Sequence, residues 1–255
     1  MNTLQFTTAV AFKAYAELRS EASRYFLSIF WWVLDPVLSM SVYYLIFGVL
    51  MLRGGPDFAP FLLTGIVVWQ WLERSALHGM GSIYGNGYLM NLIQVPKIYF
   101  PVVKIVVDTV KFGIVFLLLL VALWSLGYAP SLAYLALPAV MLVQLLLIAG
   151  VAFLLAGLMP LLPDLKYLAE VTFRLGFFVS GILFPPSRVP DQYRDLYQLN
   201  PVVNLIEAYR SILLRGEWPD WGWLLVVAAI GLLLLAAGRL VIARFEYDYP
   251  RLLSR

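Results

Sequence analysis

The sequence contains no cysteine, which excludes disulfide bonds, thiol chemistry and thiolate metal sites. It contains no Gly-Lys dipeptide either, so the phosphate-binding loop GxxxxGK[ST] is absent and ATP cannot be bound by that route. The single histidine, His78, has no second histidine to join it, and is more typical of an interfacial residue than of a metal ligand or base. Paired carboxylates and the spacing of a catalytic triad are not apparent. We therefore expect no catalytic residue, no metal site and no cofactor bound by this chain.

Charged residues are scarce as well. They make up 13% of the 255 residues, against about 25% in a typical soluble domain. Hydrophobic residues make up 62% and the mean hydropathy is +0.84. The apolar runs are continuous rather than alternating, which favours membrane-spanning helices over a barrel. The fold class expected is an all-α polytopic membrane protein, and the formal charge of +3 is too small to suggest a nucleic-acid partner.

Runs of roughly 20 apolar residues, long enough to cross a bilayer, recur along the chain. The pattern predicts an amphipathic, cytoplasmic interfacial helix in residues 1–24, with no signal peptide there, followed by a six-span domain in residues 25–255. An even number of spans leaves both termini on one side, and that side carries thirteen of the eighteen Lys and Arg residues. The positive-inside rule therefore predicts cytoplasmic termini. The predicted spans are 25–52, 58–77, 102–126, 132–158, 165–184 and 221–243.

Proline and aspartate are expected to interrupt two of these spans. Pro36 should kink the first span, with Asp35 as the cap of its crossing part, and Asp164 should cap the fifth span. On the cytoplasmic side, the stretch 79–101 reads GMGSIYGNGYLMNLIQVPKIYFP and is the only long polar, glycine-rich interruption. It carries no ligand cluster and no nucleophile with a base. We interpret it as a segment that another protein binds.

Two charged faces and several aromatic rings could line a pathway. Lys104, Asp108 and Lys111 form one stripe on the third span, and the fifth carries a ladder of alternating charge. Mutual pairing or snorkelling explains such charges as well as the inner mouth of a pathway does, where the cations would suit a lipid phosphate. Most aromatic rings are typical of the membrane interface, and a minority could stack on sugars. The candidate channel or entrance residues are Trp32, Asp35, Tyr43, Lys104, Asp108, Lys111, Lys166, Glu170 and Arg174.

A second amphipathic helix is expected in the outer segment 185–220. Asn200 can cap it, Pro201 can occupy its first turn, and Gly216 can close it. At about 15 residues it is too short to span, so it should lie flat in the outer leaflet or re-enter it. A helix that only packs on the bundle and an outer gate remain equally open. The candidate gate residues are Asn200, Pro201, Glu207, Tyr209 and Arg210, with Tyr209 on the apolar face and Glu207 and Arg210 on the polar face.

With these elements placed, the sequence resembles the membrane subunit of ATP-binding-cassette polysaccharide exporters for O-antigen, capsule and teichoic-acid chains. The resemblance covers nearly the whole chain and rests on the order of its motifs, which are YFLSIFWWVLDP, LTGIVVWQWLERS, the stretch 79–101 ending in PKIYFP, PDLKYLAE, GILFPPSRVP and NPVVNLIEAYRSILL. Asp35-Pro36 stands where the family often has Gln-Pro, Leu27-Ser28 where it has Leu-Gly, and Pro163-Asp164 where it has Arg-Asp.

The resemblance implies a homodimer with two copies of a separate nucleotide-binding ATPase, which uses ATP and Mg. It implies that the first and fifth spans line the channel, that short outer helices gate the exit, and that a coupling helix in 79–101 contacts the ATPase. Tyr84, Tyr88, Leu89 and Met90 would pack into a cleft of that partner. The residues assigned to coupling are Ser82, Ile83, Tyr84, Gly85, Asn86, Gly87, Tyr88, Leu89, Met90 and Asn91.

The function expected is ATP-driven export of a lipid-linked polysaccharide, O-antigen-like, across the inner membrane from the cytoplasm, with membrane lipids as further partners. One alternative is a permease for a small molecule or drug in the same superfamily. Another, from a different class, is an intramembrane lipid or glycosyl transferase, which would need an acidic motif or metal site at a membrane face.

Overall fold

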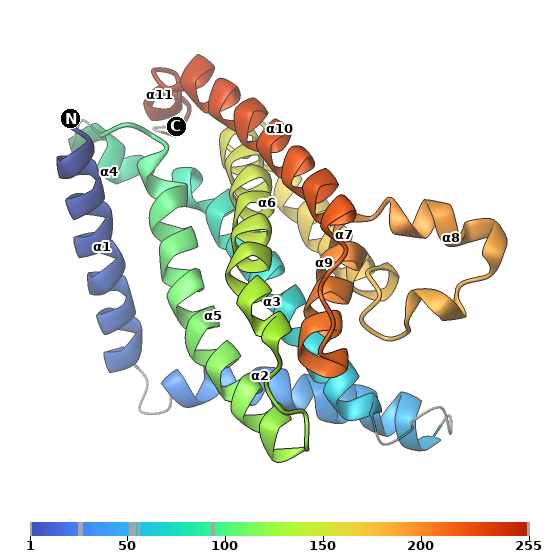
Figure 1. Ribbon diagram of the computed structural model, residues 1–255. Coiled ribbons are helices and arrows are strands. Elements are labelled where there is room, and N and C mark those ends of the chain that lie inside the picture. The colour runs from blue at the N-terminus through green and yellow to red at the C-terminus, as the bar shows by residue number, and fades with distance from the viewer. Residues whose placement is uncertain (1, 25–27, 51–54, 56, 93–94, 254–255) are drawn as a thin grey trace.

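The computed structural model describes residues 2–24, 28–50, 55, 57–92 and 95–253 and is helical, with no strand in these ranges (Figure 1). The predicted all-helical fold is therefore confirmed. The residues Arg53-Gly54-Gly55-Pro56-Asp57, whose sequence predicts a tight turn between the first two spans, lie mostly outside the described residues. The elements in chain order are α1 (Thr3–Arg24), α2 (Ser28–Tyr43), η1 (π, Tyr44–Leu50), α3 (Phe58–Tyr84), α4 (Gly87–Leu92), α5 (Tyr99–Ser125), η2 (3-10, Leu132–Ala136), α6 (Leu137–Leu158), α7 (Leu165–Val179), η3 (3-10, Pro186–Arg188), α8 (Asp191–Gln198), α9 (Pro201–Arg210), η4 (π, Ser211–Arg215), α10 (Trp221–Phe245) and α11 (Tyr249–Leu252).

Three of the described helical segments are long and apolar enough to cross a membrane: Tyr99–Ser125, Leu132–Leu158 and Trp221–Phe245. The other predicted spans also contain helices. α3 has 27 residues but carries charged residues in its middle, and α7 has only 15. Leu34–Leu50 is a shorter apolar helix.

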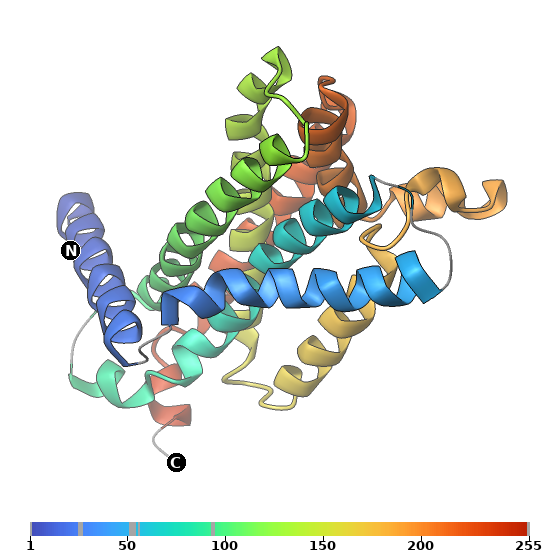
Figure 2. The same cartoon turned by 90° about the horizontal axis from the view of Figure 1, so that it is seen from below.

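The helices form a bundle in which α3 packs against both α5 and α6, and α10 packs along α6 (Figures 1 and 2). α1 packs against α5 at the edge of the bundle. α2 crosses α3, as Figure 2 shows. Both termini lie at the same end of the bundle, together with α4 and α11.

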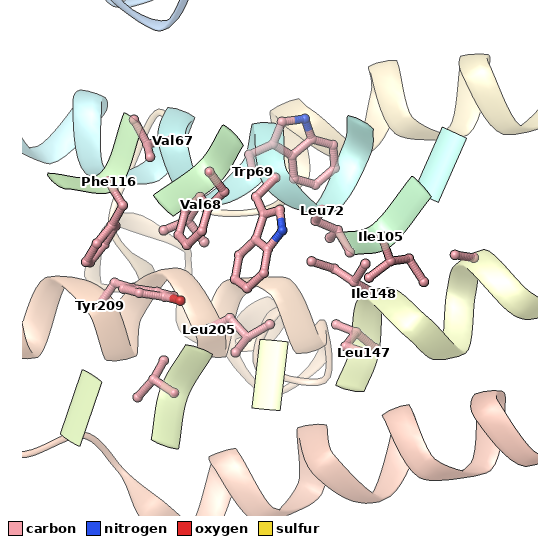
Figure 3. Packing of buried hydrophobic residues seen from close by; sticks show 14 of the residues in the cluster. Val67, Val68, Trp69, Leu72, Ile105, Phe116, Leu147, Ile148, Leu205 and Tyr209 are labelled. Carbon is pink, nitrogen blue, oxygen red and sulfur yellow. The ribbon is translucent and has the colours of Figure 1, made fainter. Parts of the chain in front are cut away.

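The core is built from large side chains of α3 that face α5, α6 and α9. Figure 3 shows Trp69 and Leu72 of α3 among Ile105, Ile148 and Leu205 of those three helices. Beside them, the rings of Trp71 and Phe112 stack with centroids 3.9 Å apart and planes 8° from parallel. α3 is therefore the central helix, and its face determines where the other three pack.

Small residues let α6 and α10 approach closely. A Cβ added at Gly238 would lie 2.5 Å from the backbone nitrogen of Leu154, and one added at Gly150 would lie 2.6 Å from the carbonyl oxygen of Gly231. Between membrane helices, such backbone contact replaces the hydrophobic driving force that lipid cannot supply. Because Gly231 and Gly238 lie about two turns apart on one face of α10, the close contact extends along both helices.

Three local predictions are wrong. Asp35 does not cap a new helix, because α2 continues through Pro36 and the Asp35 carboxylate binds side chains of α3. Asp164 stands at the N-cap of α7, but its side chain makes no capping hydrogen bond. The second predicted span does not end near residue 77, because α3 extends to Tyr84 with Gly79 inside it, where a Cβ would lie 2.7 Å from that of Ala152.

The end of the fifth predicted span also differs from the prediction. α7 stops at Val179 rather than at residue 184, and Gly181 adopts a positive φ of 77°. That left-handed conformation suits glycine, and it turns the chain sharply at the end of the helix. Ile182 and Leu183 are consequently buried against the bundle instead of continuing the helix.

Candidate functional site

The segment predicted to carry the coupling helix consists of the end of α3, a turn and the short helix α4. α3 ends at Tyr84, Gly85 and Asn86 turn the chain, and α4 follows from Gly87. The turn is tied to α3 because the Asn86 amide donates a hydrogen bond of 2.7 Å to the carbonyl oxygen of Ser82. Ser82 and Ile83 themselves are buried in the bundle.

The exposed side chains of this segment are tyrosines. Tyr84 is 44% exposed and Tyr88 is 78% exposed, and large aromatic rings of this kind are typical anchors for a protein partner. Met90, predicted to pack into a partner, is instead buried in this chain at 5% exposure, and that part of the prediction is wrong. The side chains of Leu89 and Asn91 lie outside those that the structure describes.

The predicted stripe on α5 binds helix α1. The Lys104 ammonium lies 2.8 Å from a carboxylate oxygen of Glu17, and the Lys111 ammonium lies 2.5 Å from that of Glu21. Asp108 is buried and lies 3.8 Å from Lys111. Pairing between helices therefore accounts for these charges, although a role at the entrance of a pathway stays a prediction.

His78 joins the same network. Its Nδ1 atom lies 2.8 Å from a carboxylate oxygen of Asp108, so the imidazole links the C-terminal third of α3 to α5. Half of the side chain is exposed, as expected for an interfacial residue. No group of three or more potential metal-ligating residues lies around it or elsewhere in the described part of the chain.

A polar groove of about 540 Å³ runs between α2, α3 and α7. Tyr43, Glu170 and Arg174, three of the predicted channel residues, line it together with Gln70 and Glu73 of α3.

Asp35, another predicted channel residue, also faces α3. Its carboxylate pairs with the Arg74 guanidinium and accepts a 3.1 Å hydrogen bond from the Gln70 amide. The hydrogen bond from Gln70 to Asp35 ties α3 to α2. Because Gln70 also lines the polar groove, this connection lies next to the groove. The side chain of Trp32 lies outside those described.

The ladder on α7 does not form the internal ion pairs that its spacing allows. Lys166, Glu170 and Arg174 make no ion pair with any described residue, and Lys166 and Arg174 are exposed on the helix surface. Unpaired charges on a helix at membrane depth are costly unless they face water or a partner. This surface of α7 is therefore unsuited to lipid.

Helix α9, predicted as part of an outer gate, has the predicted cap. The Asn200 side chain accepts a 3.0 Å hydrogen bond from the backbone N–H of Val202. Pro201 occupies the first position of α9, and Gly216 closes η4 in the left-handed conformation. Glu207 pairs with Arg215 at 2.8 Å, and Tyr209 is buried, as expected for its apolar face.

Arg210, predicted to lie on the polar face of this helix, is buried instead. Arg210 is 1% exposed and its guanidinium donates to the carbonyl oxygens of Gly181 at 2.6 Å, Ile182 at 3.0 Å and Phe61 at 3.0 Å. It also lies over the Phe61 ring, 3.3 Å from the centroid. Burial lowers the pKa of Arg210 to about 9, with Glu207 opposing the shift, so the group remains charged at neutral pH. Arg210 therefore joins α9, the turn after α7 and the N-terminal end of α3.

Several polar residues that the structure brings to these places were not selected from the sequence. Gln70, Glu73 and Arg74 lie in the run WQWLERS, and a pair of charges inside an apolar span was the available signal. The tail after α10 carried no comparable signal. It returns to the bundle and packs against α4 and the end of α6.

These features define a helical membrane protein whose charges join its helices, and which leaves exposed tyrosines at one end and unpaired charges on one helix face. The chain belongs to the ABC-2 type transporter membrane family, whose model matches residues 15–214. It is 29% identical over 223 residues to the O-antigen export system permease protein RfbA of Myxococcus xanthus, covering 87% of this chain and 86% of that protein.

Two further relatives carry similar names. The chain is 23% identical over 224 residues to an O-antigen export system permease protein RfbA of Klebsiella pneumoniae, covering 88% of this chain and 86% of that protein. It is 25% identical over 203 residues to the polysialic acid transport protein KpsM of Escherichia coli, covering 78% of this chain and 79% of that protein. The resemblance to polysaccharide export permeases is therefore confirmed.

Proposed function

We propose that this chain is the transmembrane subunit of an ATP-driven exporter that moves a lipid-linked, O-antigen-like polysaccharide from the cytoplasm across the inner membrane. The observation that carries the proposal is similarity along most of the chain to permeases named for O-antigen export and polysialic acid transport. The family match runs from residue 15 to residue 214, so it includes both α4 and α9.

An external motor fits both the sequence and the exposed tyrosines. The chain has no phosphate-binding loop, so ATP and Mg would be used by a separate subunit, present in two copies. Tyr84, the last residue of α3, and Tyr88 of α4 offer two exposed aromatic rings at the end of the bundle where both termini lie. A few aromatic anchors of this kind carry much of the binding energy in protein interfaces.

A homodimer fits the exposed face of α7. A six-span subunit with cytoplasmic termini would place α7 within the membrane, where its unpaired Lys166 and Arg174 need water or protein around them. A second copy facing α2 and α7 would enclose the polar groove lined by Tyr43, Glu170 and Arg174. The groove would then become part of a pathway for a hydrated chain.

The proposal is tested by reconstitution. The chain is co-expressed with a candidate nucleotide-binding subunit, and the complex is placed in proteoliposomes with lipid-linked glycan extracted from cells that lack this chain. ATP turnover should require both subunits and should rise when the glycan is added. Turnover that responds to small hydrophobic molecules and ignores the glycan would instead identify a small-molecule permease.

The contact is tested by Tyr88→Ala. This change should release the ATPase during purification and abolish glycan-stimulated turnover, because it removes the most exposed ring of the segment. Tyr193→Ala is the matched control, since Tyr193 is exposed on α8, which lies on another side of the bundle from α4. Equal retention of the ATPase by both variants would refute the coupling role of α4.

A further inference from the structure

The tail that follows α10, defined here as residues 246–253, turns back to the bundle and packs against α4. α4 ends at Leu92 and α11 begins at Tyr249, so the two helices are far apart in the sequence. They are nevertheless adjacent in space, at the end of the bundle where the termini lie (Figures 1 and 2).

Three contacts hold the tail. The Tyr249 side chain is 0% exposed and its hydroxyl donates a 2.9 Å hydrogen bond to the carbonyl oxygen of Gly157, at the end of α6. A carboxylate oxygen of Glu246 accepts a 3.1 Å hydrogen bond from the backbone N–H of Lys97, just before α5. Leu253 packs against the hydrophobic core and against Gly87, the first residue of α4. The tail therefore touches α4, the start of α5 and the end of α6.

Gly87 is what allows the closest of these approaches. A Cβ added at Gly87 would lie 2.9 Å from the Cβ of Leu253, which is shorter than real Cβ contacts. The buried position of Gly87 thus follows from the side chain of Leu253 lying directly on its backbone. The two residues fit only because one of them lacks a side chain.

α4 needs such a support. It has six residues, and isolated helices shorter than about 12–15 residues are marginal in water. Gly85 and Gly87 flank its start, and glycine weakens a helix further. Its position must therefore come from packing, which the described residues supply through buried Met90 and through the tail.

We propose that the tail is a positioning element for α4: it holds α4 against the ends of α5 and α6, so that a displacement of α4 is passed to the bundle. This inference rests on the proposed function for its consequence, because the partner that displaces α4 is the ATPase. The contact itself does not depend on that function. Gly87 and Leu253 are the residues that carry it, and Tyr249 anchors the tail to α6.

The contact is tested with a disulfide. The chain has no cysteine, so Gly87→Cys together with Leu253→Cys creates a unique pair. A disulfide needs Cβ atoms about 3.5–4.5 Å apart, which a small shift from the present spacing provides. We expect the pair to oxidise in the reconstituted complex, and oxidation to leave the glycan-stimulated ATP turnover of this variant equal to that of its reduced form. Failure to form the disulfide, or turnover lost on oxidation and regained on reduction, would overturn the proposal.

The positioning role is tested by changing the size of the side chains at positions 87 and 253. Gly87→Ala should weaken ATPase binding about tenfold, which corresponds to about 1.4 kcal/mol. Leu253→Gly removes the same contact from the other side, so it should weaken ATPase binding by a similar factor, and the double variant should lose little more than either single variant. Gly113→Ala is the control, because a Cβ there meets nothing within 4 Å. Additive losses in the double variant would overturn the proposal, since two changes that remove one and the same contact cannot be additive.

Tyr88→Ala in the same preparation separates the two ideas. If Tyr88→Ala leaves ATPase binding intact while the disulfide forms, the proposed coupling role fails and the tail contact stands. If Tyr88→Ala releases the ATPase but Gly87→Ala has no effect, coupling at α4 stands and the positioning role of the tail is refuted.

Discussion

Replacing Arg210 by methionine should destabilise the bundle around α9 more than any change to an exposed charge there. Arg210→Met keeps an unbranched side chain but removes the guanidinium. Three carbonyl oxygens, of Gly181, Ile182 and Phe61, then lose their donor, and the Phe61 ring loses the cation above it. The guanidinium would then no longer tie the turn after α7 to α3 and α9.

The magnitude follows from these contacts. Each carbonyl left without a donor costs about 1 kcal/mol at the lower end of the usual range. The cation–π contact adds about 0.5–2 kcal/mol. Together these losses destabilise the fold by about 3.5–5 kcal/mol. Methionine does not pay the desolvation penalty of a buried guanidinium, which reduces the net loss to about 3–4 kcal/mol. For a chain of this size, about 2–4 °C of midpoint shift per kcal/mol predicts a fall of roughly 10 °C.

The assay is thermal unfolding in detergent at one fixed heating rate, followed by size-exclusion chromatography. Arg215→Met is the matched control, because Arg215 is more exposed and pairs with Glu207 near the surface, where a pair contributes about 0.2–1 kcal/mol. Arg210→Lys should fall between the two, since an ammonium lacks the fork that reaches several carbonyls. The reasoning is refuted if Arg210→Met and Arg215→Met unfold at the same temperature.

Three further predictions concern other contacts. Gly65→Ala should lower the free energy of unfolding by about 1–3 kcal/mol, because the new Cβ would lie 2.8 Å from the Arg210 guanidinium. Its control, Gly113→Ala, should be neutral or stabilising in the same thermal assay. Glu17→Lys and Lys104→Glu should each lower the free energy of unfolding by about 1 kcal/mol at low salt, because each places like charges together. The double variant exchanges the two charges and should restore the stability. A double variant no more stable than the single variants would contradict the pairing of α1 with α5. Burial raises the pKa of Tyr249 to about 12, from about 10 in the unfolded chain. The neutral, buried phenol therefore contributes its full share to the free energy of unfolding below pH 10, and this share is lost as the pH rises through 12. Tyr249→Phe should therefore lose less stability than the parent chain over that interval, and equal losses would argue against the buried hydroxyl.

Helix positions followed from the sequence because their signals are local. Hydropathy and helical periodicity predict α1, α5, α6 and α10 to within a few residues. The Asn200 cap and the closing Gly216 were also predictable, since each acts on its own turn.

The local predictions that failed concern residues whose position is set by a contact with a distant part of the chain. Asp35 was expected to cap a helix, and it instead binds Arg74 of α3 while α2 runs through Pro36. Gly79 was expected to lie beyond the second span, and it instead lies inside α3 where Ala152 approaches. Neither contact is visible in the segment that contains the residue.

The charged residues show the limit of reasoning from spacing. The positions of Lys104 and Lys111 on one face of α5 were readable, but their partners Glu17 and Glu21 belong to a different helix, far away along the chain. Spacing also allowed the charges of α7 to pair along their own helix, which they do not do. A helical face can be derived from periodicity, whereas the partner that covers it cannot.

Arg210 is the clearest case. A helical wheel places it with Glu207 and Arg215, and composition favours an exposed arginine. Two of its three carbonyl acceptors, those of Gly181 and Ile182, are available only because α7 ends at Val179 and the chain turns at Gly181. No single segment contains that arrangement.

The sequence by itself determined a helical membrane protein without a phosphate-binding loop, because hydropathy, helix length and the missing Gly-Lys pair are properties of the chain alone. The tertiary structure decided which charges bind helices, which tyrosines stay exposed, and that the tail packs on α4. The reason is physical: a backbone in lipid must satisfy its own hydrogen bonds within each helix, so helices are encoded locally. Contacts between helices depend on side chains brought together from distant segments, and only packing selects among them.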